Sequence, residues 1–283
     1  MERRAEVLAR RSLKGGAKVE GLRRAVALTD LTTLEGRDSP GRIRSLCRKA
    51  LQPAGEPGLL PPVAAVCVHP RWVALARDCL EGSAVRVASV ATGFPSGQIP
   101  LDLRLAEIER VVAGGASEVD VVLSRGLFLA GRLREVEEEL RAFRQAAGGA
   151  CLKVILETGE LAGFDAVRLA GEMALAAGAD FLKTSTGKVH PAATPAVVLV
   201  LLETVREHER RTGRRVGVKA AGGIRTAKQA LQYLVLVKET VGEAWLRPEL
   251  FRFGASSLVD DLVRQFRKQT LGPYAATWDV PLG

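Results

Sequence analysis

Histidine and cysteine are scarce in this chain of 283 residues, and their scarcity limits the chemistry that it can perform. The three histidines form no HExxH motif or similar cluster, which argues against a histidine-ligated metal site. The four cysteines are scattered without metal-ligand spacing, and a core of this size needs no disulfide bonds. We therefore expect reduced thiols, a cytoplasmic location and no bound metal.

Long apolar runs and aromatic residues are also lacking. No stretch of eighteen apolar residues occurs, so we expect no membrane-spanning helix, and MERRAEVLARRSLKGG lacks the apolar core of a secretory signal. The net charge is +9, yet only 5% of the residues are aromatic and no nucleic-acid-binding motif is present. The charge excess suits an anionic surface or a phosphorylated metabolite, and the missing motifs argue against nucleic acid as the primary ligand.

Eight short apolar, β-branched runs alternate with helical patterns along the chain. The runs cover residues 24–30, 63–70, 85–92, 118–124, 152–159, 180–186, 216–223 and 250–257. Between them, segments such as 105–116 and 133–149 carry apolar residues at three- and four-residue spacing. The alternation predicts a (β/α)8 TIM barrel. An open doubly wound sheet usually has fewer strands, and its G-x-G-x-x-G motif is absent after the first run.

No linker or change of composition divides the chain, so we predict a single domain over residues 1–283. Within it we expect an N-terminal helical extension over 1–24 that closes the bottom of the barrel. The barrel itself is expected over 25–258, followed by a C-terminal helix and tail over 259–283. Ser39 and Pro40 have the pattern of an N-cap followed by the first helical position.

Four successive predicted strands each contain one ionisable residue. Asp120 lies in the fourth, Lys153 in the fifth, Lys183 in the sixth and Lys219 in the seventh. An unpaired buried charge costs several kcal/mol, so such positions indicate either function or, as the alternative, a buried ion-pair network. Burial and neighbouring cations both lower the pKa of a lysine, which makes its amine a nucleophile for carbonyl carbon. The pattern predicts a Schiff-base site.

Glycine-rich turns follow the last two predicted strands, in KAAGGIRTA and FGASSLVDD. Phosphate groups commonly bind at these two loops in (β/α)8 enzymes, because backbone N–H groups and a helix N-terminus converge there. Glycine lets the backbone approach an anion closely, and hydroxyl and guanidinium groups add donors. The candidate phosphate contacts are Gly222, Gly223, Arg225, Gly254, Ser256 and Ser257.

Six motifs then indicate a family: TDLTTLEG, EVDVVLSRG, LKVILETGEL, FLKTSTGK, VKAAGGIR and FRFGASS. In this order, from about residue 24 to 257 and beyond, they resemble deoxyribose-phosphate aldolases, and LARRSLK with YAATWDVP resembles the animal-type branch. The resemblance implies a class I aldolase without a cofactor. Such enzymes reversibly cleave 2-deoxy-D-ribose 5-phosphate to D-glyceraldehyde 3-phosphate and acetaldehyde, in deoxyribonucleoside catabolism.

The resemblance also implies roles for individual residues. Lys183 matches the Schiff-base lysine, and Asp120 with Lys219 matches the proton-transfer pair. Lys153 is expected to modulate charge beside Lys183. The other substrate-side positions are Thr32, Cys67, Gly187 and Lys188, with the six phosphate contacts named above. The chain departs from the family at Ala220, where proline is common, and in VHPAAT, which lacks a common asparagine. Tyr274 is the nearest counterpart of a tail tyrosine.

Two other functions stay open on the sequence alone. One is a phosphate-binding isomerase or synthase that uses Asp120 as an acid/base without a covalent step. The other is a binding protein, with RNA as a candidate ligand, that has lost turnover. Assembly into a homo-oligomer also stays open.

Overall fold

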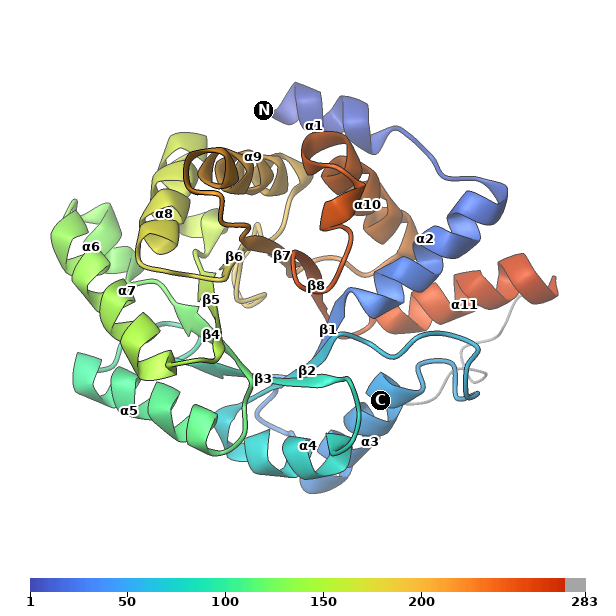
Figure 1. Ribbon diagram of the computed structural model, residues 1–283, viewed down its shortest axis with the longest axis horizontal. Coiled ribbons are helices and arrows are strands. Elements are labelled where there is room, and N and C mark those ends of the chain that lie inside the picture. The colour runs from blue at the N-terminus through green and yellow to red at the C-terminus, as the bar shows by residue number, and fades with distance from the viewer. Residues whose placement is uncertain (273–283) are drawn as a thin grey trace.

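The computed structural model describes residues 1–272, and its centre is a closed barrel of eight parallel strands (Figure 1). Each strand pairs with the next in sequence order, and β1 pairs with β8 to close the barrel. The strands are β1 (Thr29–Thr32), β2 (Ala65–Val68), β3 (Arg86–Ala91), β4 (Glu118–Val122), β5 (Cys151–Ile155), β6 (Phe181–Lys183), β7 (Gly217–Ala221) and β8 (Phe251–Ala255). The (β/α)8 prediction is confirmed.

Helices form a ring around the strands, because neighbouring parallel strands require a crossover connection (Figure 1). They are α3 (Pro40–Leu51), α4 (Val73–Leu80), α5 (Leu101–Ala113), α6 (Arg125–Leu129), α7 (Leu133–Ala147), α8 (Phe164–Ala176), α9 (Pro195–Thr212), α10 (Ala227–Val241) and α11 (Leu258–Leu271). Short 3₁₀ turns cover Pro70–Trp72, Thr158–Glu160 and Glu243–Trp245. Ser39 caps α3 by accepting the Arg42 N–H, as its sequence predicts.

Alternation along the strands separates two interiors. Val119 and Val121 belong to the apolar cluster that packs the strands against the helices. Because successive strand residues point to opposite faces, Glu118 and Asp120 point into the barrel. On β2, Ala65 and Cys67 belong to a separate small cluster with residues of β3. The barrel interior is therefore apolar on the β2–β3 side and charged along β1, β4, β5, β6, β7 and β8.

The first predicted strand is wrong for most of its length. Residues 24–27 belong to α2 (Gly15–Ala27), and β1 begins at Thr29. Leu22, Ala25 and Val26 are all buried, and this three- and four-residue spacing forms one face of a helix. The apolar residues before Thr29 therefore continue that helical face. The other seven observed strands all overlap the predicted runs.

The N-terminal extension contains two helices, where the sequence predicted one that closes an end of the barrel. α1 (Glu2–Ala9) packs against α9 and α10, and α2 packs against α10 and α11. Both helices therefore lie against the outer ring (Figure 1). Arg4 anchors α1 through an ion pair with Glu203, at 2.6 Å. The predicted tail, including Tyr274, lies outside the described residues, and no helix in residues 1–272 is long and apolar enough to cross a membrane.

Candidate active site

The four charged residues singled out in the sequence meet inside the barrel. Strand register pairs Asp120 of β4 with Lys153 of β5, and Lys183 of β6 with Lys219 of β7. All four side chains point inward, and none is more than 3% exposed. The structure therefore places three lysines and a carboxylate within one enclosed space.

Asp120 lies at the centre of this group. Its Oδ2 accepts hydrogen bonds from the Nζ atoms of Lys183 and Lys219, both at 2.7 Å. Its Oδ1 accepts from Lys153 Nζ at 3.0 Å. One carboxylate thus contacts all three lysines, which couples the protonation states of the four groups.

The sequence interpretation missed three further members of the group. Asp30 of β1 lies 2.6 Å from Lys219 Nζ, and Glu118 of β4 lies 2.5 Å from Lys153 Nζ. Arg252 of β8 bonds to both acids, to Asp30 and to Glu118 Oε1 at 2.9 Å. Glu118 was recognisable, because it stands two residues before Asp120 and must share its face of the strand.

The network is nearly balanced in charge. It contains three carboxylates (Asp30, Glu118, Asp120) and four cations (Lys153, Lys183, Lys219, Arg252), which leaves one excess positive charge. The sequence interpretation saw one acid among three lysines and therefore judged a buried ion-pair network a poor fit. That judgement was wrong, because carboxylates on β1 and β4 offset most of the repulsion.

The three lysines differ in pKa. Burial lowers the pKa of Lys183, and neighbouring Lys219 lowers it further, against the opposing effect of Asp120. Burial also acts on Lys219 and Lys153, but their carboxylate neighbours outweigh it and raise both pKa values. Burial would raise the pKa of Asp120, yet the three lysines hold it well below its usual value. Of the three lysines, Lys183 therefore loses its proton most readily and forms the neutral amine at the lowest pH.

A cavity of about 260 Å³ opens above Lys183 and Lys219, at the carboxyl ends of the strands. Loops after β1, β6, β7 and β8 surround it. The cavity contains nine of the predicted substrate-side residues, namely Thr32, Gly187, Lys188, Gly222, Gly223, Arg225, Gly254, Ser256 and Ser257. The other two predicted residues, Cys67 and Lys153, are completely buried and do not line it. Burial raises the pKa of the Cys67 thiol, which disfavours a thiolate there.

The rim of the cavity on the β7–β8 side presents donors to solvent. Ser256 and Ser257 are exposed just before α11, and Arg225 is exposed just before α10. Across the cavity, Lys188 Nζ forms an ion pair with Glu35 at 2.9 Å, and this contact lowers the pKa of Glu35. The buried lysines below the cavity and the hydrogen-bond donors at its rim are thus separate parts of one cavity.

Two glycines are required for different physical reasons. A Cβ on Gly222, which has φ +86°, would lie 2.6 Å from Ala192 Cβ and 3.0 Å from Gly187 Cα, so the loops after β6 and β7 are in close contact. A Cβ on Gly254 would lie 3.0 Å from Lys219 Cε. The sequence interpretation assigned Gly254 to an anion; in the structure Gly254 lines the cavity, and its missing side chain also leaves room for Lys219.

Glu157 is a further residue that the sequence interpretation did not single out. It is fully buried and adopts a left-handed conformation at φ 53°, which is unfavourable for a side chain of this size. Its carboxylate accepts the Thr186 N–H at 3.2 Å and also the Thr186 hydroxyl. Thr186 Oγ1 in turn accepts the Lys188 N–H at 3.1 Å. Glu157 therefore holds the loop that follows Lys183.

A closed parallel barrel with a buried, low-pKa lysine at the carboxyl ends of its strands defines an enzyme of the (β/α)8 class. The chain belongs to the DeoC/LacD aldolase family, whose sequence model matches residues 24–261. It is 46% identical to deoxyribose-phosphate aldolase of Homo sapiens over 99% of this chain and 92% of the relative. It is 45% identical to the Mus musculus enzyme, over 100% and 92%. The tetrameric deoxyribose phosphate aldolase structure from Aeropyrum pernix aligns with a TM-score of 0.69 and 26% identity, over 90% of this chain and 99% of that one.

Proposed function

We propose that the protein is an aldolase that reversibly cleaves 2-deoxy-D-ribose 5-phosphate to D-glyceraldehyde 3-phosphate and acetaldehyde. The observation that carries the proposal is Lys183. Its amine lies at the floor of the cavity with a lowered pKa, beneath a rim of phosphate-compatible donors. An amine nucleophile at one end and an anion site at the other match an aldehyde that carries a terminal phosphate.

The first step forms an imine. The neutral Lys183 amine adds to C1 of the open-chain sugar, and loss of water leaves an iminium ion. The iminium draws the electrons of the C2–C3 bond toward nitrogen as the C3 hydroxyl loses its proton. Glyceraldehyde 3-phosphate departs and leaves an enamine on Lys183. A proton added at C2 and hydrolysis of the resulting iminium release acetaldehyde and restore the amine.

Asp120 and Lys219 are the proposed proton-transfer pair. The ammonium form of Lys183 can donate three hydrogens, whereas the iminium retains one. Imine formation therefore removes donors from Asp120 Oδ2, which makes the carboxylate more basic when the C3 proton must move. Lys219 shares that oxygen at 2.7 Å and supplies the acidic partner for protonation of the enamine.

Borohydride trapping tests the proposal. Reduction in the presence of acetaldehyde should fix a two-carbon label on the peptide that bears Lys183, as detected by mass spectrometry. The Lys183→Met variant should take up no label and lose turnover. A label confined to Lys153 or Lys219, with Lys183 unmodified, would reject the assignment. No trapping, combined with isomerisation of a sugar phosphate, would favour the noncovalent acid/base alternative.

The phosphate contacts, the assembly state and the cellular setting are further parts of the proposal. Arg225, Ser256 and Ser257 are proposed to bind the phosphate because they surround the cavity rim away from Asp120. A homo-oligomer, a cytoplasmic location and a role in deoxyribonucleoside catabolism are proposed from the family. Light scattering of the purified chain tests the first of these three, fractionation of the source cells the second, and growth on deoxyribonucleosides the third.

A further inference from the structure

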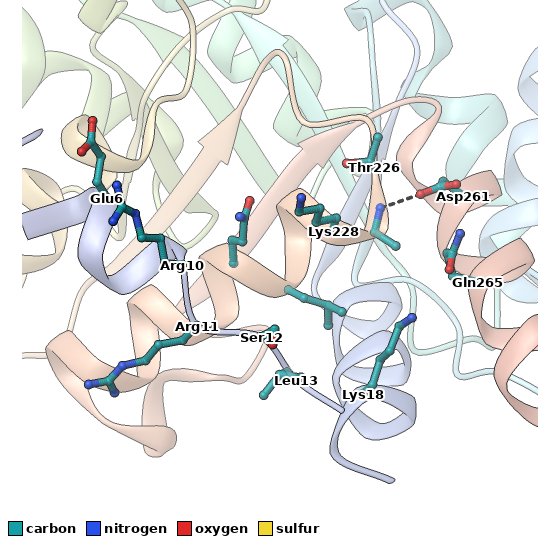
Figure 2. A pocket seen from close by; sticks show the side chains of 13 residues that line it. Glu6, Arg10, Arg11, Ser12, Leu13, Lys18, Thr226, Lys228, Asp261 and Gln265 are labelled. Atoms are coloured by element: carbon teal, nitrogen blue, oxygen red, sulfur yellow. Dashed lines mark hydrogen bonds between the residues drawn. The ribbon is translucent and has the colours of Figure 1, made fainter. Parts of the chain in front are cut away.

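A second cavity lies outside the barrel, between the N-terminal extension and helices α10 and α11 (Figure 2). Its volume is about 900 Å³, compared with about 260 Å³ for the catalytic cavity. The walls come from the end of α1, the link to α2, α2 itself, the first turns of α10 and the first turns of α11. None of the proposed catalytic or phosphate-binding residues lines it.

The walls of this cavity carry more positive than negative charge. The cations are Arg10, Arg11, Lys18 and Lys228, and the acids are Glu6 and Asp261. Arg11 is engaged with Glu239 at 2.7 Å. Asp261 is engaged with the Ala227 N–H at 2.7 Å, as Figure 2 shows, and with Arg264.

The other three cations, unlike Arg11, have no carboxylate partner among the described residues. Among residues 1–272, the structure gives no ion pair to Arg10, Lys18 or Lys228. Lys18 extends from α2, Lys228 lies on α10 and Arg10 lies at the end of α1, so the three charges come from different sides of the cavity (Figure 2). Unpaired cations from separate elements favour a multiply charged anion.

An apolar surface completes the cavity. Leu231 is buried on α10, and Leu13 is half-buried on the link before α2. Gly21 of α2 brings the two leucines against the helix backbone, because a Cβ there would lie 2.7 Å from Leu231 Cδ2 and 3.0 Å from Leu13 Cδ1. The two side chains therefore form a packed wall beside the cations.

We propose that this cavity binds a phosphate monoester with an attached flat apolar group, of the size of a nucleoside monophosphate. The phosphate dianion would lie among Arg10, Lys18 and Lys228, and the apolar group against Leu13 and Leu231. This cavity is larger than the one proposed to bind a sugar phosphate, so it has room for a base in addition. Cavities of this volume are typical of small-molecule sites.

Binding here would act on the catalytic cavity through the start of α10. Arg225 lines the catalytic cavity, while Thr226 and Lys228 line the second one. Gln229 Oε1 accepts from the backbone N–H groups of both Arg225 and Thr226, at 3.0 and 3.1 Å, so these bonds join the turn between the two cavities to the first turn of α10. A ligand on Lys228 should therefore change KM for the sugar phosphate more than kcat. This consequence rests on the proposed function; the binding itself does not.

Calorimetric titration of the full chain with deoxyadenosine 5′-monophosphate tests the site. The titration is repeated with Ser256→Asp, and an unchanged affinity would show that the probe does not bind at the catalytic rim. We expect saturable one-to-one binding, weakened at least about tenfold by Lys18→Glu with Lys228→Glu, since two charge contacts are lost. The matched control is Arg210→Glu with Arg211→Glu, which makes the same charge change on exposed positions at the end of α9 and should leave binding unchanged.

Further probes separate the two halves of the site. Leu13→Ser should weaken binding of the nucleotide and leave the weaker binding of inorganic phosphate unchanged. Equal losses in the two double variants would show nonspecific charge attraction and overturn the proposal. Inorganic phosphate that binds as tightly as the nucleotide, or an absence of saturable binding, would overturn it as well. Because the readout is binding, these outcomes are independent of aldolase turnover.

Discussion

Lys183 and Lys219 are register partners on neighbouring strands, and both donate to the same oxygen, Asp120 Oδ2, at 2.7 Å. The two amines nevertheless have opposite pKa shifts. Both lysines line the cavity, but Lys219 has a second carboxylate partner in Asp30, at 2.6 Å, whereas Lys183 pairs with Asp120. The difference in partners accompanies a lowered pKa for Lys183 and a raised pKa for Lys219.

Replacing Lys219 should move the pH dependence of imine formation. Lys219 lowers the pKa of Lys183, and its removal also leaves Asp120 free to stabilise the Lys183 ammonium ion. Both effects raise the pKa of Lys183. The neutral amine then forms only at higher pH, so in Lys219→Leu the half-maximal pH for borohydride trapping should rise and most turnover should be lost. An unchanged midpoint would show that the two charges are not coupled.

Replacing Asp120 should have the opposite effect on trapping. Asp120 raises the pKa of Lys183, so Asp120→Asn should lower that pKa and shift trapping to lower pH. Turnover should still fall by about a hundredfold or more, because the proton-transfer group is lost. Exchange of the acetaldehyde methyl hydrogens with deuterated water should fall with it. Exchange at the normal rate in both Asp120→Asn and Lys219→Leu would exclude the pair as the proton shuttle.

Ser256 offers a test of the phosphate rim. Ser256→Asp places a negative charge beside the expected phosphate, so KM for deoxyribose 5-phosphate should rise, while activity on unphosphorylated deoxyribose changes little. The ratio of kcat/KM values for the two sugars measures this preference. If that ratio stays the same, the phosphate lies elsewhere. The chain already has a carboxylate at Asp260, four residues after Ser256. A change in the ratio would therefore depend on where the new carboxylate lies and not only on the presence of a negative charge nearby.

Glu157 should affect substrate affinity through the loop after Lys183. Glu157→Gln removes a charged acceptor from two Thr186 donors, and bonds to charged groups contribute about 1.5 to 3 kcal/mol. We expect KM to rise about tenfold with a smaller change in kcat, and Glu157→Asp to restore part of the loss. The matched control is Glu160→Gln on the same turn, where the carboxylate pairs with Arg125 instead. Equal effects from the two glutamine variants would count against a specific role for Glu157.

A side chain at position 254 should affect both the packing of the barrel and the position of Lys219. An added methyl group in Gly254→Ala would meet Ala221 Cβ at 2.8 Å and Lys219 Cε at 3.0 Å, so Lys219 must shift. We expect a loss of about 1 to 3 kcal/mol in the free energy of unfolding, together with lower turnover. Gly149→Ala is the control, because an added Cβ there meets nothing within 4 Å. Wild-type turnover in Gly254→Ala would show that Lys219 tolerates displacement.

Much of the barrel was predictable because parallel strands and their crossover helices have distinct periodicities. The apolar runs around Asp120 and Lys153 are buried on both faces, so they stand out in the sequence as strands. The first strand was misplaced because Ala25 and Val26 are apolar and suit either structure. A short apolar run does not distinguish a strand from the buried end of a helix.

The sequence by itself determined the fold class, the identity of Lys183 as a charged residue in an apolar strand, and the glycine-rich turns after β7 and β8. These are local patterns, and local patterns are visible along the chain. The tertiary structure alone decided the charge balance, because Asp30, Glu118 and Arg252 lie on strands far apart in sequence and meet Lys153 and Lys219 only when the barrel closes. It also decided which of the three lysines has the lowered pKa, since a pKa depends on distance to every neighbouring charge.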